Sequence, residues 1–284
     1  MARIAIILIA VLALSGCAAT PAPDDGRVHV VASTNVYGGI AEAIGGDLVV
    51  VSSLIAGPAQ DPHSFEASAS DQLAISKADI VIENGGGYDS FIDTLLDAAS
   101  SEASVITAAE VVGLADGANE HLWYDFDAVQ LVAEAIADEF GSLDRSNAAD
   151  YEQNLEAFTA QLDQLRSSTT DIGAGRTAAI TEPVPLYLLE AAGFENTTPG
   201  EFSEAIEEGT DVPPAVLKEA LDTIDETALL AYNSQTASAE TEKLRAAAED
   251  AGVPVVEFTE TLPDGEDYIS WMTANVSAIT AALQ

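Results

Sequence analysis

Residues 146–170 read SNAADYEQNLEAFTAQLDQLRSSTT, and this stretch decides how the rest of the chain divides. Large apolar side chains recur in it at alternating steps of four and three residues, the spacing of one helix face. These side chains are Tyr151, Leu155, Phe158, Leu162 and Leu165. The spacing predicts one long amphipathic helix that connects two parts of the protein stiffly. A coiled-coil arm for dimerisation is the alternative, but the pattern spans too few heptads to favour it, so a monomer is expected.

On both sides of this helix, short apolar runs rich in β-branched residues alternate with helical periodicities. Runs of this kind are typical of strands that are covered on both faces, and their alternation with helices predicts mostly parallel sheets. The expected strands are 28–32, 48–51, 79–82, 104–107, 177–181, 228–232 and 253–258. The expected helices are 36–44, 68–77, 88–98, one from Asp125 or Asp127 to Phe140, then 184–192, 213–223, 237–250 and 267–283. The predicted fold class is therefore α/β, with two lobes joined by a single long helix.

The N-terminus has the pattern of an export signal. Arg3 precedes the apolar run 4–14, which is short for a membrane span and ends at small residues. Leu14-Ser15-Gly16-Cys17 resembles the bacterial lipoprotein cleavage motif, and Cys17 is the only cysteine, so lipidation is the role expected for it. The predicted divisions are a signal peptide (1–16), a lipidated tether (17–27), an N-terminal lobe (28–143), the linker helix (144–172) and a C-terminal lobe (173–284).

The chain is strongly acidic. It carries 48 Asp and Glu against nine Lys and Arg, for a formal net charge of −39. This balance argues against a nucleic-acid partner, which needs a basic surface, and favours the accumulation of cations near the protein. Adaptation to salt or plain compositional bias explains most of these carboxylates equally well.

Four polar side chains follow predicted strands, where ligands of parallel sheets gather. They are His63, His121, Glu182 and Glu260. Two imidazoles and two carboxylates from the two lobes would form a four-point cage for a divalent transition metal. None of the four lies at short ligand spacing from another, and each glutamate taken alone is equally well explained as a solvated carboxylate.

A family resemblance adds to this pattern. Asp61-Pro62-His63-Ser64-Phe65-Glu66, His121-Leu122-Trp123 and the lipoprotein leader together resemble the zinc/manganese solute-binding proteins of bacterial ABC transporters. The resemblance implies two α/β lobes with a metal cleft between them and capture of Zn²⁺ or Mn²⁺ outside the cell. It also implies a lipid anchor on the outer face of the membrane, delivery to an ABC permease, and no catalysis. It assigns His63, His121, Glu182 and Glu260 as the first to fourth ligands.

The sequence departs from the family pattern at three places. Asn119-Glu120 replaces the usual Asp-Pro before the second histidine, Asn233-Ser234-Gln235 replaces Glu-Pro-Gln, and Glu260 stands where aspartate is usual. Glu120 is therefore a competing ligand candidate. Two imidazoles with two carboxylates leave zinc and manganese open.

Side chains near the ligands have two possible roles each. Glu66 and Asp125 could orient the imidazoles, or they could start helices, with Asp125 as an N-cap. Trp123 and Trp271 are expected to pack in the core rather than to stack on a ligand, and His29 is expected to be structural.

Two other functions compete with metal delivery. A zinc-dependent hydrolase would use three of the same ligands and keep one position open for water, although the chain has no His-Glu-x-x-His motif and no convincing Gly-x-Ser-x-Gly turn. A surface adhesin lipoprotein is the other alternative, and it would show an exposed apolar patch away from the cleft.

Overall fold

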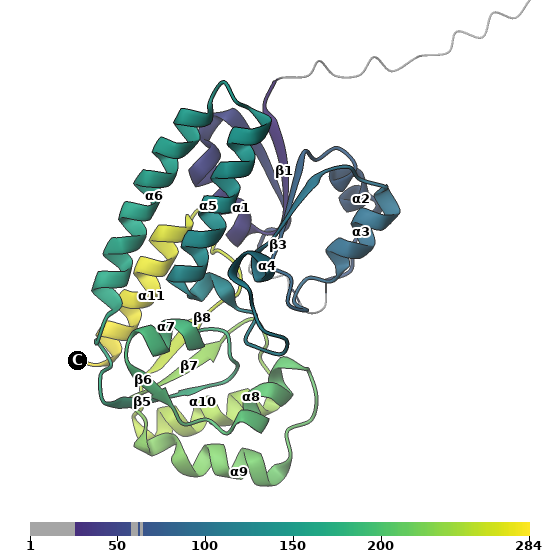
Figure 1. Ribbon diagram of the computed structural model, residues 1–284. Coiled ribbons are helices and arrows are strands. Elements are labelled where there is room, and N and C mark those ends of the chain that lie inside the picture. Colours follow the sequence, from purple (N-terminus) through teal and green to yellow (C-terminus); the bar gives the residue numbers. More distant parts are fainter. Residues whose placement is uncertain (1–25, 58–61, 63–64) are drawn as a thin grey trace, which may run out of the picture.

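The computed structural model describes residues 26–57, 62 and 65–284 and contains two parallel four-stranded sheets (Figure 1). The first has the order β2-β1-β3-β4, with β1 Val28–Thr34, β2 Val49–Ile55, β3 Ile80–Glu83 and β4 Ser104–Thr107. The second has the order β6-β5-β7-β8, with β5 Arg176–Ile180, β6 Phe194–Asn196, β7 Leu229–Asn233 and β8 Val255–Phe258. The two orders are equivalent, which confirms the α/β class and a similarity of architecture between the halves.

Each sheet reverses its strand order between its two central strands, β1 and β3 in one sheet and β5 and β7 in the other. All residues of β3 and β7 are buried, as expected for strands that helices cover on both faces. In an open parallel sheet the carboxyl ends of the strands at such a reversal form a natural binding crevice. Each half therefore has one topological switch point of this kind.

Helices follow the strands in both halves. In the first half they are α1 Asn35–Gly45, η1 Gly46–Leu48, α2 Ala69–Ile75, α3 Phe91–Ala99, α4 Ala108–Val112, η3 Leu122–Tyr124, α5 Phe126–Leu143 and α6 Ala148–Thr169. In the second they are α7 Leu186–Ala191, α8 Gly200–Glu207, α9 Pro214–Thr223, η4 Ile224–Glu226, α10 Ala239–Ala251 and α11 Tyr268–Ala282. Within the described ranges, no helix is long and apolar enough to cross a membrane.

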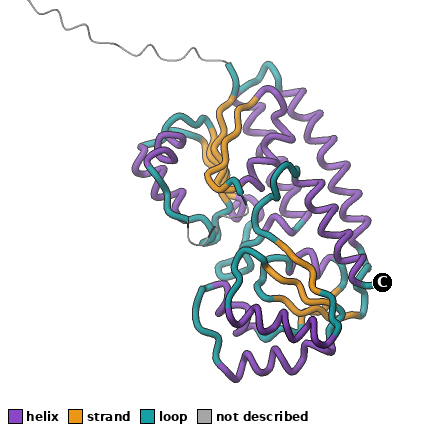
Figure 2. Tube along the Cα trace, turned by 180° about the vertical axis from the view of Figure 1, so that it is seen from behind, coloured by secondary structure: helices purple, strands orange, loops and turns teal. Residues whose placement is uncertain are grey.

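The long helix predicted over 146–170 is α6, and it runs along one side of the molecule from the first sheet toward the second (Figures 1 and 2). The helix does not stand alone, because α1, α5 and the C-terminal helix α11 pack against it. Tyr151, Phe158, Leu162 and Leu165 of its apolar stripe are buried. One continuous hydrophobic cluster extends from β1 through α6 into β7 and α11. The domain boundaries given above stay a prediction.

Among the α-helices and strands of the described ranges, α4, β6 and α8 were not predicted from the sequence, and neither were the short helices η1, η3 and η4. Strand β6 has three residues, two of them exposed, so it carries no alternating pattern. Helix α8 has only eight residues and begins directly after Pro199, in a stretch that looks like a loop. Of the predicted functional residues, Cys17 and His63 lie outside the described residues.

Candidate metal centre

His121 lies on the loop before η3, and its side chain is fully buried. Its Nδ1 is 2.7 Å from Oδ1 of Asn119, and its backbone N–H donates to the same oxygen at 3.1 Å. Because that oxygen accepts from a backbone N–H, it is the carbonyl oxygen of the amide, and Nδ1 must carry the proton of the neutral ring. Nε2 is thereby left with its lone pair, which is the form that coordinates metals.

Asn119 also ties this loop to the second half of the chain. Its Nδ2 donates to the backbone carbonyl of Pro183 at 3.0 Å, and its own backbone carbonyl accepts from the Tyr187 hydroxyl at 2.7 Å. Pro183 is the neighbour of Glu182, so the support of one predicted ligand touches the neighbour of another. Asparagine thus supplies the acceptor that the family's aspartate would offer, but without its charge.

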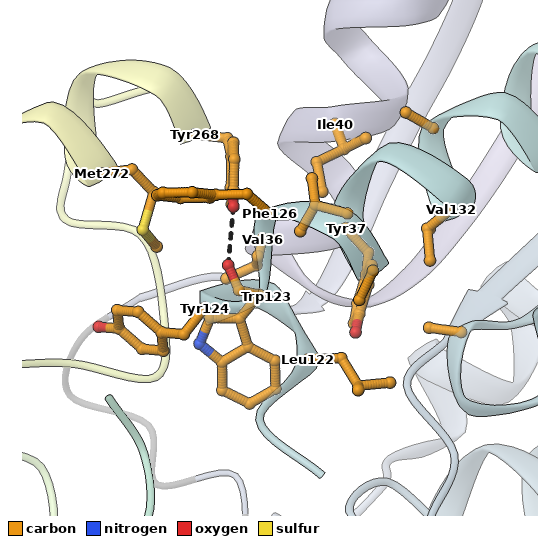
Figure 3. Close-up of a cluster of buried hydrophobic side chains, with 14 of the residues drawn as sticks. Val36, Tyr37, Ile40, Leu122, Trp123, Tyr124, Phe126, Val132, Tyr268 and Met272 are labelled. Carbon is orange, nitrogen blue, oxygen red and sulfur yellow. Dashed lines mark hydrogen bonds between the residues drawn. The ribbon is translucent and has the colours of Figure 1, made fainter. Parts of the chain in front are cut away.

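An aromatic cluster forms the wall behind His121. The Trp123 ring is fully buried and lies edge-on to the imidazole, with ring centroids 5.1 Å apart. The backbone carbonyl of Trp123 accepts from the Tyr268 hydroxyl at 2.7 Å, which links η3 to α11 (Figure 3). Burial of Trp123 and Trp271 confirms their predicted role in packing.

Glu182 follows β5 and Glu260 follows β8, and one amide holds both carboxylates. Asn233 Nδ2, at the end of β7, donates to Glu182 Oε2 at 2.6 Å and to Glu260 Oε1 at 2.8 Å. Asn233 Oδ1 accepts from the Gln235 backbone N–H at 3.0 Å, which orients the amide group. Where the family often has a glutamate, this chain therefore places a donor that brings two carboxylates together.

The loop that carries Glu260 is fixed by the first half of the molecule. The Tyr124 hydroxyl donates to the Thr259 carbonyl at 2.7 Å. The Asn35 side chain accepts from the Leu262 N–H at 2.9 Å and donates to the Leu262 carbonyl at 3.0 Å. Hydrogen bonds on both sides of Glu260 thus place its side chain between the halves.

Tyr88 contacts Glu260 directly from the first half. Its hydroxyl donates to Glu260 Oε2 at 3.1 Å, and burial, with the nearby charge of Glu260, raises the pKa of Tyr88 well above its ordinary value. Tyr88 therefore stays a protonated donor. The preceding loop needs glycine: Gly85 has φ +70°, and a Cβ there would lie 2.4 Å from Thr107 Cγ2.

Two carboxylates approach the Nε2 atom of His121. Glu260 Oε2 lies 4.0 Å away, and Glu207 Oε1, at the end of α8, lies 3.5 Å away. Glu182 and Glu260 are buried, with relative exposures of 1% and 0%. Buried carboxylates are stable only when they are hydrogen-bonded and paired with positive charge, and a divalent cation is one source of such charge.

The structure brings three of the four predicted ligands into one region. His121 lies beside Glu260, and Asn233 joins Glu260 to Glu182. In the ranges that the structure describes, no group of three His, Cys, Asp or Glu side chains could hold a metal ion. Their role as ligands stays a prediction, as does that of His63.

The side chains proposed to support the ligands lie as follows. Asp125 Oδ1 accepts from the N–H groups of Asp127 and Ala128, so Asp125 is the N-cap of α5. Glu66 is exposed. Glu120 contributes its backbone carbonyl, which accepts from Asn84 Nδ2 at 3.0 Å. Glu207 had no signal in the sequence, because it belongs to the short helix that was not predicted.

Comparison with known proteins agrees with this geometry. A family model described as zinc-uptake complex component A, periplasmic (ZnuA), matches residues 30–282. The chain is 28% identical to the manganese-binding lipoprotein MntA of Halalkalibacterium halodurans, covering 98% of this chain and 97% of the relative.

Two further relatives agree. The manganese ABC transporter substrate-binding lipoprotein PsaA of Streptococcus anginosus is 26% identical, covering 98% of this chain and 97% of that protein. The solved structure of FpvC from Pseudomonas aeruginosa in complex with Mn²⁺ superimposes with a TM-score of 0.75 at 26% identity, covering 91% of this chain and 98% of that one. The family model matches residues 30–282, and the fold and the positions of His121, Glu182 and Glu260 agree with it. The chain therefore belongs to the family of periplasmic zinc-uptake component A proteins.

Proposed function

We propose that this chain captures a divalent transition metal, Zn²⁺ or Mn²⁺, outside the cytoplasmic membrane and delivers it to an ABC permease. One observation carries the proposal: a buried imidazole of the first half faces buried carboxylates of the second half, at 4.0 Å between His121 Nε2 and Glu260 Oε2. Such a site would hold the metal ion between the halves, and no reaction would be catalysed there. His63, His121, Glu182 and Glu260 are the proposed ligands.

The choice between the two metals follows from the donor set. Imidazole suits zinc and carboxylate oxygens suit manganese, so a site with both types accepts either ion. Zinc is favoured by the general affinity order, and manganese is supported by the names of the relatives MntA and PsaA. Supply and coordination geometry would then set which ion is carried.

Cys17 is the proposed anchor. Lipidation there would hold the protein at the outer face of the membrane, with residues 18–27 as the tether, and the protein would act as a monomer. Family membership places the chain among metal-uptake components, not among enzymes, so the zinc hydrolase alternative is not retained. The adhesin alternative stays a prediction.

Metal analysis of the purified mature chain tests the function. After dialysis against equimolar Zn²⁺ and Mn²⁺, we expect elemental analysis to find one ion for each chain, and calorimetry to give a single high-affinity site. A chain that retains neither metal, and whose unfolding temperature neither metal raises, would contradict the proposed function.

A further inference from the structure

Helix α8 carries a carboxylate that none of the sequence patterns assigned to the metal site. Its last residue, Glu207, places Oε1 at 3.5 Å from the Nε2 atom of His121, whereas the nearest Glu260 oxygen lies at 4.0 Å. Both carboxylate oxygens of Glu207 are buried. The Glu207 carboxylate is thus the closer of the two to the atom that would bind the metal.

The distance has a definite chemical meaning. At 3.5 Å the two atoms are farther apart than the roughly 2.7–3.2 Å of a good N–H···O hydrogen bond. Two ligands bound to one ion by bonds of about 2.1 Å would, however, lie roughly 3.0 Å apart at right angles and roughly 3.4 Å apart at a tetrahedral angle, so wider angles in a site of higher coordination number also reach this separation. The separation between His121 and Glu207 therefore matches two ligands of the same ion.

The fold holds Glu207 in this place. Phe202, Ala205 and Ile206 bury one face of α8, and Gly209, with φ +61°, turns the chain away directly after the helix. The side chain of Glu207 is 13% exposed to solvent, whereas the side chains of His121 and Glu260 are fully buried. Glu207 thus stands between solvent and the buried ligands.

A surface pocket of about 590 Å³ has Glu207, Gln235 and Thr236 among its lining residues, and two of these contact the proposed ligands. Thr236 donates its hydroxyl to Glu182 Oε2, and the Gln235 side-chain carbonyl accepts from the backbone N–H of Glu260. The pocket and the metal centre therefore share a wall, and Glu207 forms part of it.

We propose that Glu207 is a further ligand of the captured ion, which it contacts from the side of this pocket. The proposal rests on the proposed function of the site. A third carboxylate would add a hard oxygen donor and raise the coordination number, which suits Mn²⁺ better than tetrahedral Zn²⁺. Glu207 would therefore shift the selectivity of the site toward manganese.

The test compares Glu207→Gln with the neighbouring Glu208→Gln, which removes the same charge from an exposed position. Mn²⁺ and Zn²⁺ affinities are measured by competition with a chelator. We expect Glu207→Gln to weaken Mn²⁺ binding about tenfold or more and Zn²⁺ binding less, and Glu208→Gln to leave both unchanged. The absorption of bound Co²⁺ gives a second readout, because the loss of a ligand strengthens its visible bands.

Glu207→Asp provides a variant that keeps the charge but retracts the carboxylate, and it should also lose Mn²⁺ affinity. If both Glu207 variants match the wild type in affinity and in the Co²⁺ spectrum, Glu207 is not a ligand and the proposal is overturned. A wild-type chain that binds no metal would instead overturn the proposed function itself, so the two failures are distinguishable.

Discussion

Asn119 is the single side chain that most directly fixes the chemistry of His121. Its amide oxygen lies 2.7 Å from Nδ1 and favours the tautomer with the proton on Nδ1, which leaves Nε2 as the proposed ligand atom. We expect Asn119→Ala to lower Zn²⁺ affinity by about tenfold, because outer partners of metal-bound histidines have effects of this size. Chelator competition measures the loss.

Asn119→Asp is the matched control, because it keeps an acceptor for Nδ1. It should retain most of the affinity that Asn119→Ala loses. Equal affinities for the alanine variant and the wild type would show that the tautomer of His121 does not depend on Asn119.

Glu83 predicts a specific pH dependence of stability. Burial, with a further contribution from the nearby charge of Asp89, raises its pKa from 4.5 to about 7, although the Thr107 hydroxyl donates to it at 2.7 Å. The folded state therefore favours the protonated carboxyl, so its contribution to stability is lost as pH rises from about 4.5 to about 7. Glu83→Gln should unfold in urea like the wild type at pH 4.5 but be about 2 kcal/mol more stable at pH 8. If the two proteins differed in free energy of unfolding by the same amount at pH 4.5 and at pH 8, the raised pKa of Glu83 would be contradicted.

Strand order predicts only that Glu182 and Glu260 lie near each other, because both follow strands of the same parallel sheet. His121 was assigned to the same ligand set by the family resemblance. The sequence could not predict how Asn119 and Asn233 orient them. An amide side chain donates or accepts according to its surroundings, and those surroundings come from loops that are distant in the sequence.

The helices differ in the same way: some can be predicted from their own residues, and others depend on contacts with residues that are distant in the sequence. The apolar stripe of α6 and the start of α5 are local signals; the first was predicted, and for the second the sequence offered Asp125 or Asp127, of which Asp125 is the N-cap. Helix α8 lacks a side-chain cap and a long stripe, and its Phe202 is buried by contacts made only in the folded protein. Glu207 was missed for this reason.

The N-cap of α5 distinguishes the two roles considered for Asp125. As an N-cap, Asp125→Ala should lower the free energy of unfolding by about 1 kcal/mol and leave metal affinity unchanged, because the lost hydrogen bonds belong to the helix end. Asp125→Asn, which also caps well, should keep the wild-type stability. Weaker metal binding in both variants, measured beside urea unfolding, would instead indicate contact with the metal site.

At the scale of the whole molecule, one hydrophobic cluster spans both halves, although the strands form two separate sheets and each half has a further cluster of its own. The cluster that spans both halves includes Trp123 beside the metal centre and Trp271 in α11. We expect Trp123→Phe and Trp271→Phe, each of which leaves one tryptophan, to unfold with coincident fluorescence and far-UV circular dichroism transitions. Separate midpoints within one variant would mean that the halves unfold independently.

The proposed metal centre lies between these two halves, so its proposed ligands come from both. Chelator competition with Zn²⁺ and Mn²⁺ should therefore be carried out on His63→Ala, His121→Ala, Glu182→Ala and Glu260→Ala, with Glu195→Ala as an exposed control. We expect each ligand variant to lose affinity for at least one metal by about tenfold or more, and the control to match the wild type. Wild-type affinity for both metals in His121→Ala and Glu260→Ala would place the bound metal elsewhere and contradict the proposed site.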